Sequence, residues 1–186
     1  MQTALLVIDV QQSFTARGYF RWDEVAPFLQ HQNALIEGAV AQGVPVVRVF
    51  HVDPPHDAAN QPFHHSSGLI RPLEGLAPFD AALTVEKSRH SALAGTVLPI
   101  WLRERGITRL IVSGIRTEQC CETTTRHASD EGFEVDYVSA ATLTFDMQTP
   151  AGATLTAAQI RERTETVLAG RFATICTVEQ ALQRAR

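Results

Sequence analysis

Cysteine is scarce in this 186-residue chain: there are only three, and two of them, Cys120 and Cys121, are adjacent. Three cysteines, two of them adjacent, make a poor disulfide framework, so the sequence indicates a reducing compartment. A basic leader is also lacking, and the first apolar run, in MQTALLVIDV, meets Asp9 after about five residues. Such a run is too short for a signal peptide or a membrane span, so we expect a cytoplasmic protein with no membrane partner.

An excess of positive charge is missing too, since 16 Lys and Arg stand against 20 Asp and Glu, for a net charge of −4. A nucleic-acid-binding protein would need a basic face, so we exclude that class. Internal repeats, low-complexity tracts and linkers are likewise absent from the sequence. The length suits one hydrophobic core, and we expect a single domain over residues 1–186.

What the sequence does contain is an alternation of short apolar runs with longer amphipathic stretches. The expected strands span residues 3–10, 44–52, 82–87, 108–115, 133–141 and 173–177. The expected helices span about 23–42, 96–105, 117–131, 156–168 and the residues from 178 onward. This order predicts an α/β fold: a doubly wound, Rossmann-like, six-stranded parallel sheet with helices on both faces.

Two segments are expected to be loops. Residues 53–78 contain five prolines and three histidines without periodicity, and a loop of this length in a compact domain is usually functional. The second loop covers residues 142–153.

Ionisable or reactive side chains stand where three of the expected strands end. Asp9 ends the first strand, Lys87 ends the third, and the fourth leads through Gly114 into the helix that carries Cys120. The carboxyl ends of parallel strands form one edge of the sheet, where active sites of such folds lie. We therefore expect these three side chains to meet there.

The chemistry of the three groups is complementary. With Thr117 as N-cap, Cys120 would lie in the first helical turn, where the helix dipole and the Lys87 cation favour the thiolate. Asp9 would serve as general base, and Lys87 would hold both charges in place. The structural alternatives are a capping carboxylate, a surface lysine and a small core cysteine; Cys121 is read as such a core residue.

Three stretches carry a resemblance to a known family: LLVIDVQQSF (5–14), EKSRHSALAGTVL (86–98) and GITRLIVSGIRTEQCCETTTRHASDEGFEV (106–135). Together they resemble the isochorismatase-like cysteine hydrolase superfamily, which includes nicotinamidases and carbamoylsarcosine amidohydrolases. The resemblance implies a catalytic triad of Asp9, Lys87 and Cys120. It also implies a cis peptide between Ile115 and Arg116, which would turn the backbone N–H groups of Arg116 and Cys120 towards an oxyanion, and a homodimer or larger homo-oligomer.

For substrate binding we expect Gln11, Phe14 and Arg116, together with the 53–78 loop and either Phe20 or Trp22. Arg116 stands where members of the family commonly have a small residue. Its side chain either reaches the substrate or points to solvent, and the sequence leaves both readings open.

Nicotinamidases carry an Asp–x–His motif and a further His that together bind a metal. This chain has His51, Asp53, His56, His64 and His65 in the corresponding region, but the Asp–x–His spacing is absent. We therefore expect no metal and no other cofactor, and interpret these histidines as loop residues that line a pocket. His90 and His127 are interpreted as a polar residue after a strand and a residue on a helix face.

These observations predict a cysteine-dependent hydrolase that cleaves a small amide-like substrate at a C–N bond through a covalent thioester. True isochorismatases act on a vinyl ether and need no cysteine nucleophile, so Cys120 favours C–N hydrolysis. The alternatives are a metal-assisted nicotinamidase and a catalytically idle member of the fold that binds a metabolite or a partner protein.

Overall fold

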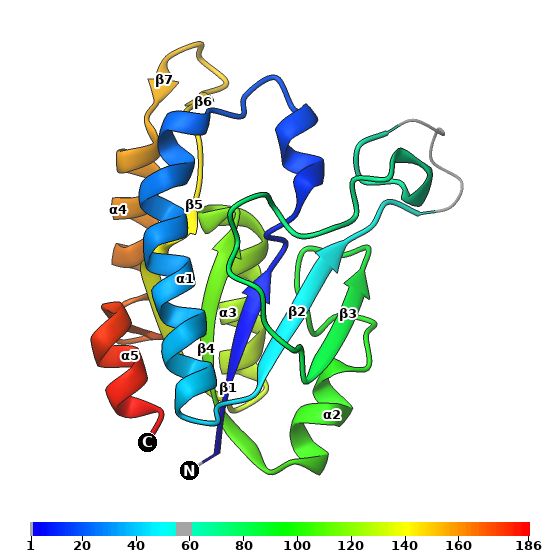
Figure 1. Ribbon diagram of the computed structural model, residues 1–186. Coiled ribbons are helices and arrows are strands. Elements are labelled where there is room, and N and C mark those ends of the chain that lie inside the picture. The colour runs from blue at the N-terminus through cyan, green and yellow to red at the C-terminus, as the bar shows by residue number, and fades with distance from the viewer. Residues whose placement is uncertain (1, 55–60) are drawn as a thin grey trace.

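The centre of the molecule is β1 (Gln2–Ile8), which lies in a six-stranded sheet of order β3-β2-β1-β4-β5-β8 (Figure 1). The structure, a computed structural model, describes residues 2–54 and 61–186. The other strands of this sheet are β2 (Val46–His51), β3 (Leu83–Lys87), β4 (Ile107–Ile115), β5 (Glu134–Leu143) and β8 (Thr174–Ile175). All neighbouring pairs are parallel, which confirms the predicted fold class.

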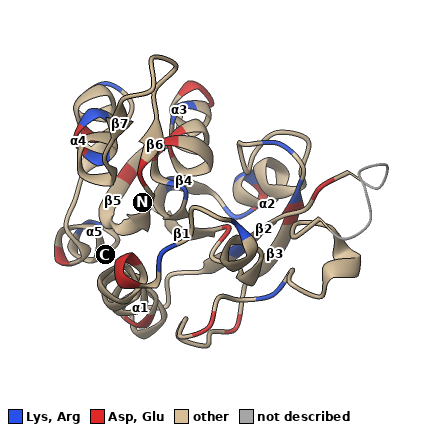
Figure 2. Cartoon of the chain, turned by 90° about the horizontal axis from the view of Figure 1, so that it is seen from above, with Lys and Arg blue, Asp and Glu red and all other residues tan. Residues whose placement is uncertain are grey.

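Helices cover both faces of the sheet, as the view onto its carboxyl edge shows (Figure 2). They are α1 (Val25–Ala41), α2 (Leu98–Glu104), α3 (Glu122–Asp130), α4 (Ala157–Leu168) and α5 (Val178–Arg184). Alternate residues of β1 supply the two hydrophobic cores: Leu5 and Val7 pack on the side of α1 and α5, and Leu6 and Ile8 on the side of α2 and α3. A strand covered on both faces needs apolar residues at every position, and this is why its sequence reads as one continuous run.

The chain changes direction across the sheet between β1 and β4. From β1 it runs outward through β2 to β3, and then crosses back to place β4 on the other side of β1. The carboxyl ends of β1 and β4 therefore border the topological switch point, where ligands of open α/β sheets bind.

At Gly114 the backbone of β4 lies very close to that of β1. This glycine has a φ of +128°, and a Cβ at this position would lie 1.9 Å from the carbonyl oxygen of Ile8. Only glycine fits such an approach, so Gly114 lets β4 turn at the switch point directly beside the end of β1.

Three details of the fold differ from the sequence-based expectation. The expected 142–153 loop starts within β5, which runs on to Leu143, and it holds one strand of an antiparallel hairpin of β6 (Met147–Gln148) and β7 (Thr154–Leu155). The helix expected over 117–131 begins as a π-helical turn, Thr117–Cys121, before α3. The helix expected from residue 23 begins as a short 3-10 turn, Trp22–Glu24.

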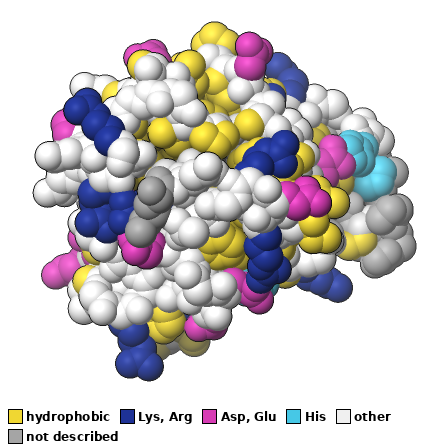
Figure 3. Space-filling model, turned by 90° about the horizontal axis from the view of Figure 1, so that it is seen from below, with side chains coloured by type: hydrophobic (Ala, Val, Ile, Leu, Met, Phe, Trp, Pro, Cys, Tyr) yellow, Lys and Arg dark blue, Asp and Glu magenta, His cyan; other side chains and the backbone are white. Residues whose placement is uncertain are grey.

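The opposite end of the molecule, where the strands begin, has a mixed surface. Basic and acidic side chains are interspersed with apolar ones over this face (Figure 3). None of the helices in the described residues combines the length and the apolar character that crossing a bilayer requires.

Candidate active site

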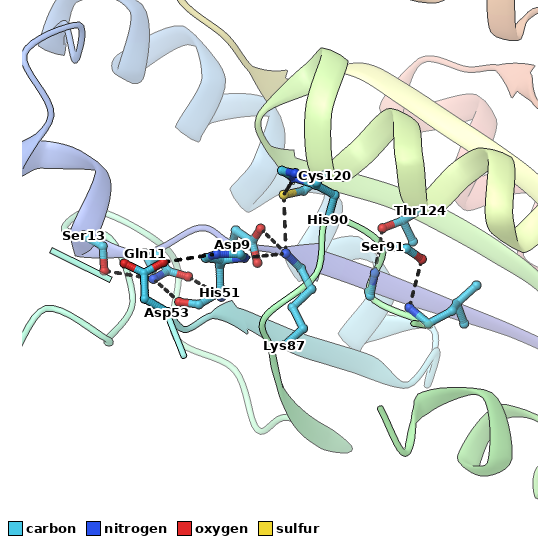
Figure 4. A network of polar contacts seen from close by, with 12 residues as sticks. Asp9, Gln11, Ser13, His51, Asp53, Lys87, His90, Ser91, Cys120 and Thr124 are labelled. Atoms are coloured by element: carbon cyan, nitrogen blue, oxygen red, sulfur yellow. Dashed lines mark hydrogen bonds and ion pairs between the residues drawn. The ribbon is translucent and has the colours of Figure 1, made fainter. Parts of the chain in front are cut away.

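Three segments far apart in the sequence bring an acid, a lysine and a thiol together at the carboxyl edge of the sheet. Asp9 follows β1, Lys87 ends β3, and Cys120 lies in the turn after β4. All three residues are buried, with exposures of 0%, 3% and 7%. Their side chains point towards one another from separate elements (Figure 4).

The ammonium group of Lys87 is the centre of this cluster. Its Nζ donates to Oδ2 of Asp9 at 2.7 Å and lies 3.3 Å from both Sγ of Cys120 and Nδ1 of His51. An ammonium has three N–H donors and no acceptor, so these contacts use all three. Burial alone would lower the pKa of Lys87, but the Asp9 carboxylate and the Cys120 sulfur outweigh it and raise this pKa. Lys87 is therefore a cation at neutral pH.

The contact with Lys87 also fixes the state of His51. Because the ammonium offers only protons, Nδ1 of His51 must be the acceptor. Burial, followed by the Lys87 charge, lowers the pKa of His51, so the imidazole is neutral with its proton on Nε2. That nitrogen lies 3.6 Å from Oδ1 of Asp53, and its proton therefore faces a carboxylate.

The two carboxylate oxygens of Asp9 have different surroundings. Oδ2 is paired with Lys87, whereas Oδ1 is buried and has no hydrogen-bond partner among the described residues. Asp9 also has a φ of 53°, in the left-handed region that non-glycine residues rarely adopt and that is frequent at functional sites. The structure thus holds one oxygen of the acid in an ion pair and leaves the other as an unused acceptor.

Cys120 lies in the π-helical turn that follows β4. Its N-cap is Arg116 and not the expected Thr117, because the Thr117 hydroxyl contacts the hydroxyl of Thr142 at 2.8 Å instead of capping the helix. The hydroxyl of Tyr137 donates to the Thr117 carbonyl at 3.0 Å. Two side chains of β5 therefore hold the start of the turn against the sheet.

The backbone around Cys120 has an unusual hydrogen-bond pattern. In an α-helix the carbonyl of Arg116 would accept the N–H of Cys120, but here it accepts those of Gln119 and Cys121, both at 3.2 Å. The peptide bond between Ile115 and Arg116 is cis, as the family resemblance implied. The turn thus directs the Arg116 carbonyl to the residues on either side of Cys120.

The thiol of Cys120 is not the stabilised thiolate that the helix position suggested. Burial, followed by the charge of Asp9, raises the pKa of Cys120, and the Lys87 cation only partly opposes this. The reason is charge balance: Asp9 and Lys87 already neutralise each other, and a thiolate would add a second negative charge to a buried site. At neutral pH the resting form is the thiol.

Cys121 has a different environment from its neighbour. It is fully buried in the hydrophobic core beneath α3, and burial raises the pKa of its thiol well above the usual value. Cys120 lines the cavity described next, whereas Cys121 packs, as expected of a core residue.

A cavity of about 310 Å³ opens above Cys120. It is lined by residues of the strand ends and of the segments that follow them: Asp9, Phe14, Arg17, Tyr19, His51, Asp53, Phe63, His90, Arg116, Gln119 and Cys120. Phe14 and Arg116, two of the residues expected to bind substrate, are among this lining. Phe20 packs on Trp22 and Phe145 and does not belong to the lining.

The structure does not place Gln11 in the cavity wall, contrary to the expected substrate contact. The side chain is fully buried, and its Oε1 accepts the N–H of His51 at 2.8 Å while its Nε2 donates to the His51 carbonyl and to Oγ of Ser13. Both ends of the amide are therefore occupied, and Gln11 holds the end of β2 so that His51 faces Lys87.

Several cavity residues were not found by sequence reasoning. Arg17 and Tyr19 follow β1 in a short irregular segment, and Gln119 lies in the π-turn, so no strand end or periodicity marks them. His90, interpreted as an ordinary polar residue, has its Nδ1 4.0 Å from Sγ of Cys120. His127 bonds Oγ of Ser91 at 2.8 Å, outside the cavity lining.

The donor atoms present do not fit a metal ion. Among the described residues, the one group of three suitable ligands within 4.8 Å of one another is Asp9, His51 and Cys120. The Lys87 ammonium contacts all three, so the centre of this group is taken by a positive charge of the protein itself.

The remaining candidate histidines do not extend that group. His64 bonds Ser66 and His65 bonds Glu86, and His56 lies outside the described residues. Among the residues that the structure describes, no further group of three donor side chains is close enough to hold a metal ion.

Comparison with known proteins shows which family the chain resembles. A sequence profile described as the Isochorismatase domain matches residues 3–180. An uncharacterised isochorismatase family protein of Bacillus subtilis, YrdC, is 29% identical over 182 residues, covering 96% of this chain and 94% of the relative. Nicotinamidase 3 of Arabidopsis thaliana is 30% identical over 154 residues, covering 77% and 74%.

Among solved structures, a cysteine hydrolase from Pseudomonas syringae pv. phaseolicola superimposes with a TM-score of 0.88. It is 26% identical in sequence, and the match covers 99% of this chain and 92% of that one. The fold and the family thus agree.

Proposed function

From the premise that the chain belongs to the isochorismatase family of hydrolases, we propose that it hydrolyses a C–N bond of a small amide-like substrate, with Cys120 as nucleophile. The observation that carries this proposal is the Lys87 ammonium, 2.7 Å from Oδ2 of Asp9 and 3.3 Å from Sγ of Cys120, while Oδ1 of Asp9 has no hydrogen-bond partner among the described residues. A buried acid with one free oxygen beside a protonated thiol suits general base catalysis better than a preformed thiolate.

In the acylation step, Sγ of Cys120 attacks the carbonyl carbon and a C–S bond forms. The thiol proton passes to Oδ1 of Asp9, so that the negative charge moves from the carboxylate to the oxygen of the substrate. The backbone N–H groups of Arg116 and Cys120 are the proposed donors to this oxyanion. When the tetrahedral intermediate collapses, the C–N bond breaks and Asp9 returns the proton to the leaving ammonia or amine.

In the deacylation step, water takes the place of the amine. Asp9 accepts a proton from this water as its oxygen attacks the thioester carbon. Collapse then breaks the C–S bond, the carboxylic acid product leaves, and the proton on Asp9 restores the thiol. Throughout, Lys87 remains charged, so the buried site never carries an uncompensated pair of negative charges.

The known relatives support this chemistry without defining the substrate. One is a nicotinamidase, and one structural neighbour is a cysteine hydrolase. The metal-assisted alternative is disfavoured by the position of the Lys87 ammonium, which contacts each ligand of the nearest donor group. The single hydrolase domain over residues 1–186, the homo-oligomer and the cytoplasmic location stay predictions.

The proposal is tested by screening amides, ureides and carbamoyl compounds for ammonia release. We expect turnover that disappears in Cys120→Ala and persists in Cys121→Ala, the matched control one position along the chain. Mass spectrometry of a quenched reaction should show an acyl adduct on Cys120. Turnover that survives in Cys120→Ala would refute the nucleophile, and absence of any amide turnover in the wild type would favour the binding-only alternative.

A further inference from the structure

We propose that the substrate is a monocarboxylate, an amide or ureide whose free carboxylate is bound by Arg17, Arg116 and Tyr19 on the cavity wall. The inference rests on the proposed amide hydrolysis for the identity of the reacting end. It concerns the other end of the molecule, which the triad does not contact.

The first observation is that Arg116 is neither solvent-exposed nor part of the core. Its side chain is 7% exposed, and it lines the cavity beside Cys120. Its Nη2 lies 3.1 Å from Oε1 of Glu118 and donates to Oγ1 of Thr144 and the carbonyl of Phe145 at 3.4 and 3.3 Å. Nε is buried without a partner among the described residues, and the contacts above all use Nη2, which leaves Nη1 as the nitrogen that can serve a ligand.

The second observation is that Arg17 and Tyr19 lie beside this group. The Arg116 guanidinium carbon lies 4.9 Å from the centre of the Tyr19 ring. Arg17 lines the same cavity, with its guanidinium 5.0 Å above the ring of Phe63. Within the part of the chain that the structure describes, Arg17 forms no ion pair with a carboxylate, so its charge is available.

Tyr19 completes the set as a donor. Burial raises the pKa of Tyr19, and the charges of Arg116 and Arg17 oppose that rise only in part. Its hydroxyl therefore keeps its proton at neutral pH and can donate to an anion that the two guanidinium groups attract.

The net charge of the residues at this part of the cavity determines which ligand charge they can bind. Arg17 and Arg116 contribute two positive charges, and Glu118 removes one through its ion pair with Arg116. The positive charge that remains at Arg17 and Arg116 favours a monoanion there, while the other charged lining residues lie elsewhere: Asp9 is paired with Lys87, and Asp53 faces His51. A planar carboxylate also matches the fork of a guanidinium, whereas a phosphate dianion would be only half neutralised.

The position of Arg116 next to the reacting end of the substrate also supports a bound carboxylate. The side chain of Arg116 and its backbone N–H, a proposed oxyanion donor, belong to one residue, so an anchored carboxylate is held at a defined distance from the carbonyl under attack. Fixing one end of a small substrate in this way aligns the other end with the nucleophile.

The test compares amic acids with their neutral diamides, such as succinamate with succinamide and glutaramate with glutaramide. Dissociation constants are measured by calorimetry on Cys120→Ala, and kcat/KM on the wild type, corrected twofold for the second amide. For at least one chain length we expect the carboxylate to be preferred about 10- to 100-fold, since charge-assisted hydrogen bonds discriminate on this scale. Arg17→Gln and Arg116→Gln should each lower this preference at least about fivefold.

Arg48→Gln is the matched control. Arg48 also stacks on a phenylalanine ring, donates through Nη2 to that residue's carbonyl and has a buried Nε without a described partner, but it lies outside the cavity. This variant should keep the carboxylate preference. Equal binding of acids and diamides at every chain length, or a preference unchanged in both cavity variants, would overturn the inference.

The two proposals fail separately. Carboxylate-selective binding to Cys120→Ala without any turnover by the wild type would refute the hydrolase and leave the anion site standing. Hydrolysis of amides without carboxylate preference would refute the anion site and leave the hydrolase proposal standing.

Discussion

The Lys87 ammonium has three N–H donors and contacts three side chains among the described residues, so each donor is used. Asp9, Cys120 and His51 each accept one contact, so the lysine cannot rotate towards a substrate without losing a buried hydrogen bond. In the proposed mechanism Lys87 therefore holds charges, and the proton moves between Cys120 and Oδ1 of Asp9.

Replacing Asp9 by Asn should therefore have two opposite effects. Turnover should fall by about 10²- to 10⁴-fold, the usual contribution of a general base. Alkylation of Cys120 by iodoacetamide at pH 7.5 should become faster, because the negative charge that helps to raise the pKa of Cys120 is gone and Lys87 is left to favour the thiolate.

Asp53→Asn is the control for this experiment. Asp53 lines the same cavity but faces His51 rather than Lys87, so alkylation should keep its wild-type rate. If Asp9→Asn left alkylation unchanged or slower, the electrostatic coupling of acid and thiol would be disproved.

At the scale of elements, the approach of β4 to β1 depends on one glycine. Gly114→Ala would place a methyl group 1.9 Å from the carbonyl oxygen of Ile8, at a φ of +128°. We expect a loss of at least about 3 kcal/mol in the free energy of unfolding, measured by urea denaturation, since a backbone clash adds to the conformational cost.

Gly132→Ala separates these two contributions. Gly132 also has a positive φ, +88°, but a Cβ there meets no atom within 4 Å. It should therefore lose only about 1–2 kcal/mol, the left-handed penalty alone. Equal losses in the two variants would show that the contact with Ile8 does not matter.

The elements were predictable from the sequence because their causes are local or repetitive. The continuous apolar run of β1 and the glycines after helices mark their own boundaries, and Asp9 and Lys87 follow directly from the strand ends. The hairpin of β6 and β7 was missed because each strand has only two residues, too few for an alternating pattern.

The cavity wall was predictable only in part, since its contacts are tertiary. Nothing in the spacing of Gln11 shows that both ends of its amide bind the backbone of His51 and that its Nε2 also donates to the hydroxyl of Ser13. The pKa of Cys120 was predicted in the wrong direction because a helix position reveals neither the depth of burial nor the nearby charge of Asp9.

At the scale of the whole molecule, buried thiols make stability depend on alkaline pH. Burial, followed by the charge of Asp136, raises the pKa of Cys176 from 9.0 to about 11. Between these values the unfolded chain releases the proton and the folded chain keeps it, so the free energy of unfolding falls as pH rises through this range. The raised pKa values of Cys120, Cys121 and Lys87 act in the same direction.

Urea denaturation from pH 7 to 11 measures this dependence. The free energy of unfolding of the wild type should be constant near neutral pH and should fall above pH 9. Cys176→Ala should lose stability less steeply between pH 9 and 11, whatever its absolute stability. Parallel curves for the two proteins would contradict the assigned proton.

In the two proposals, the five residues from Arg116 to Cys120 carry two functions on one segment of the chain. The proposed nucleophile, the proposed oxyanion donors and the arginine proposed to select the substrate are joined covalently, and Glu118, which pairs with Arg116, lies between them. In an evolving or engineered enzyme this segment would be inherited as a unit. Exchanging residues 113–122 between relatives should therefore carry substrate preference along with the proposed nucleophile, although Asp53 and Phe63 of the 53–78 loop also line the cavity.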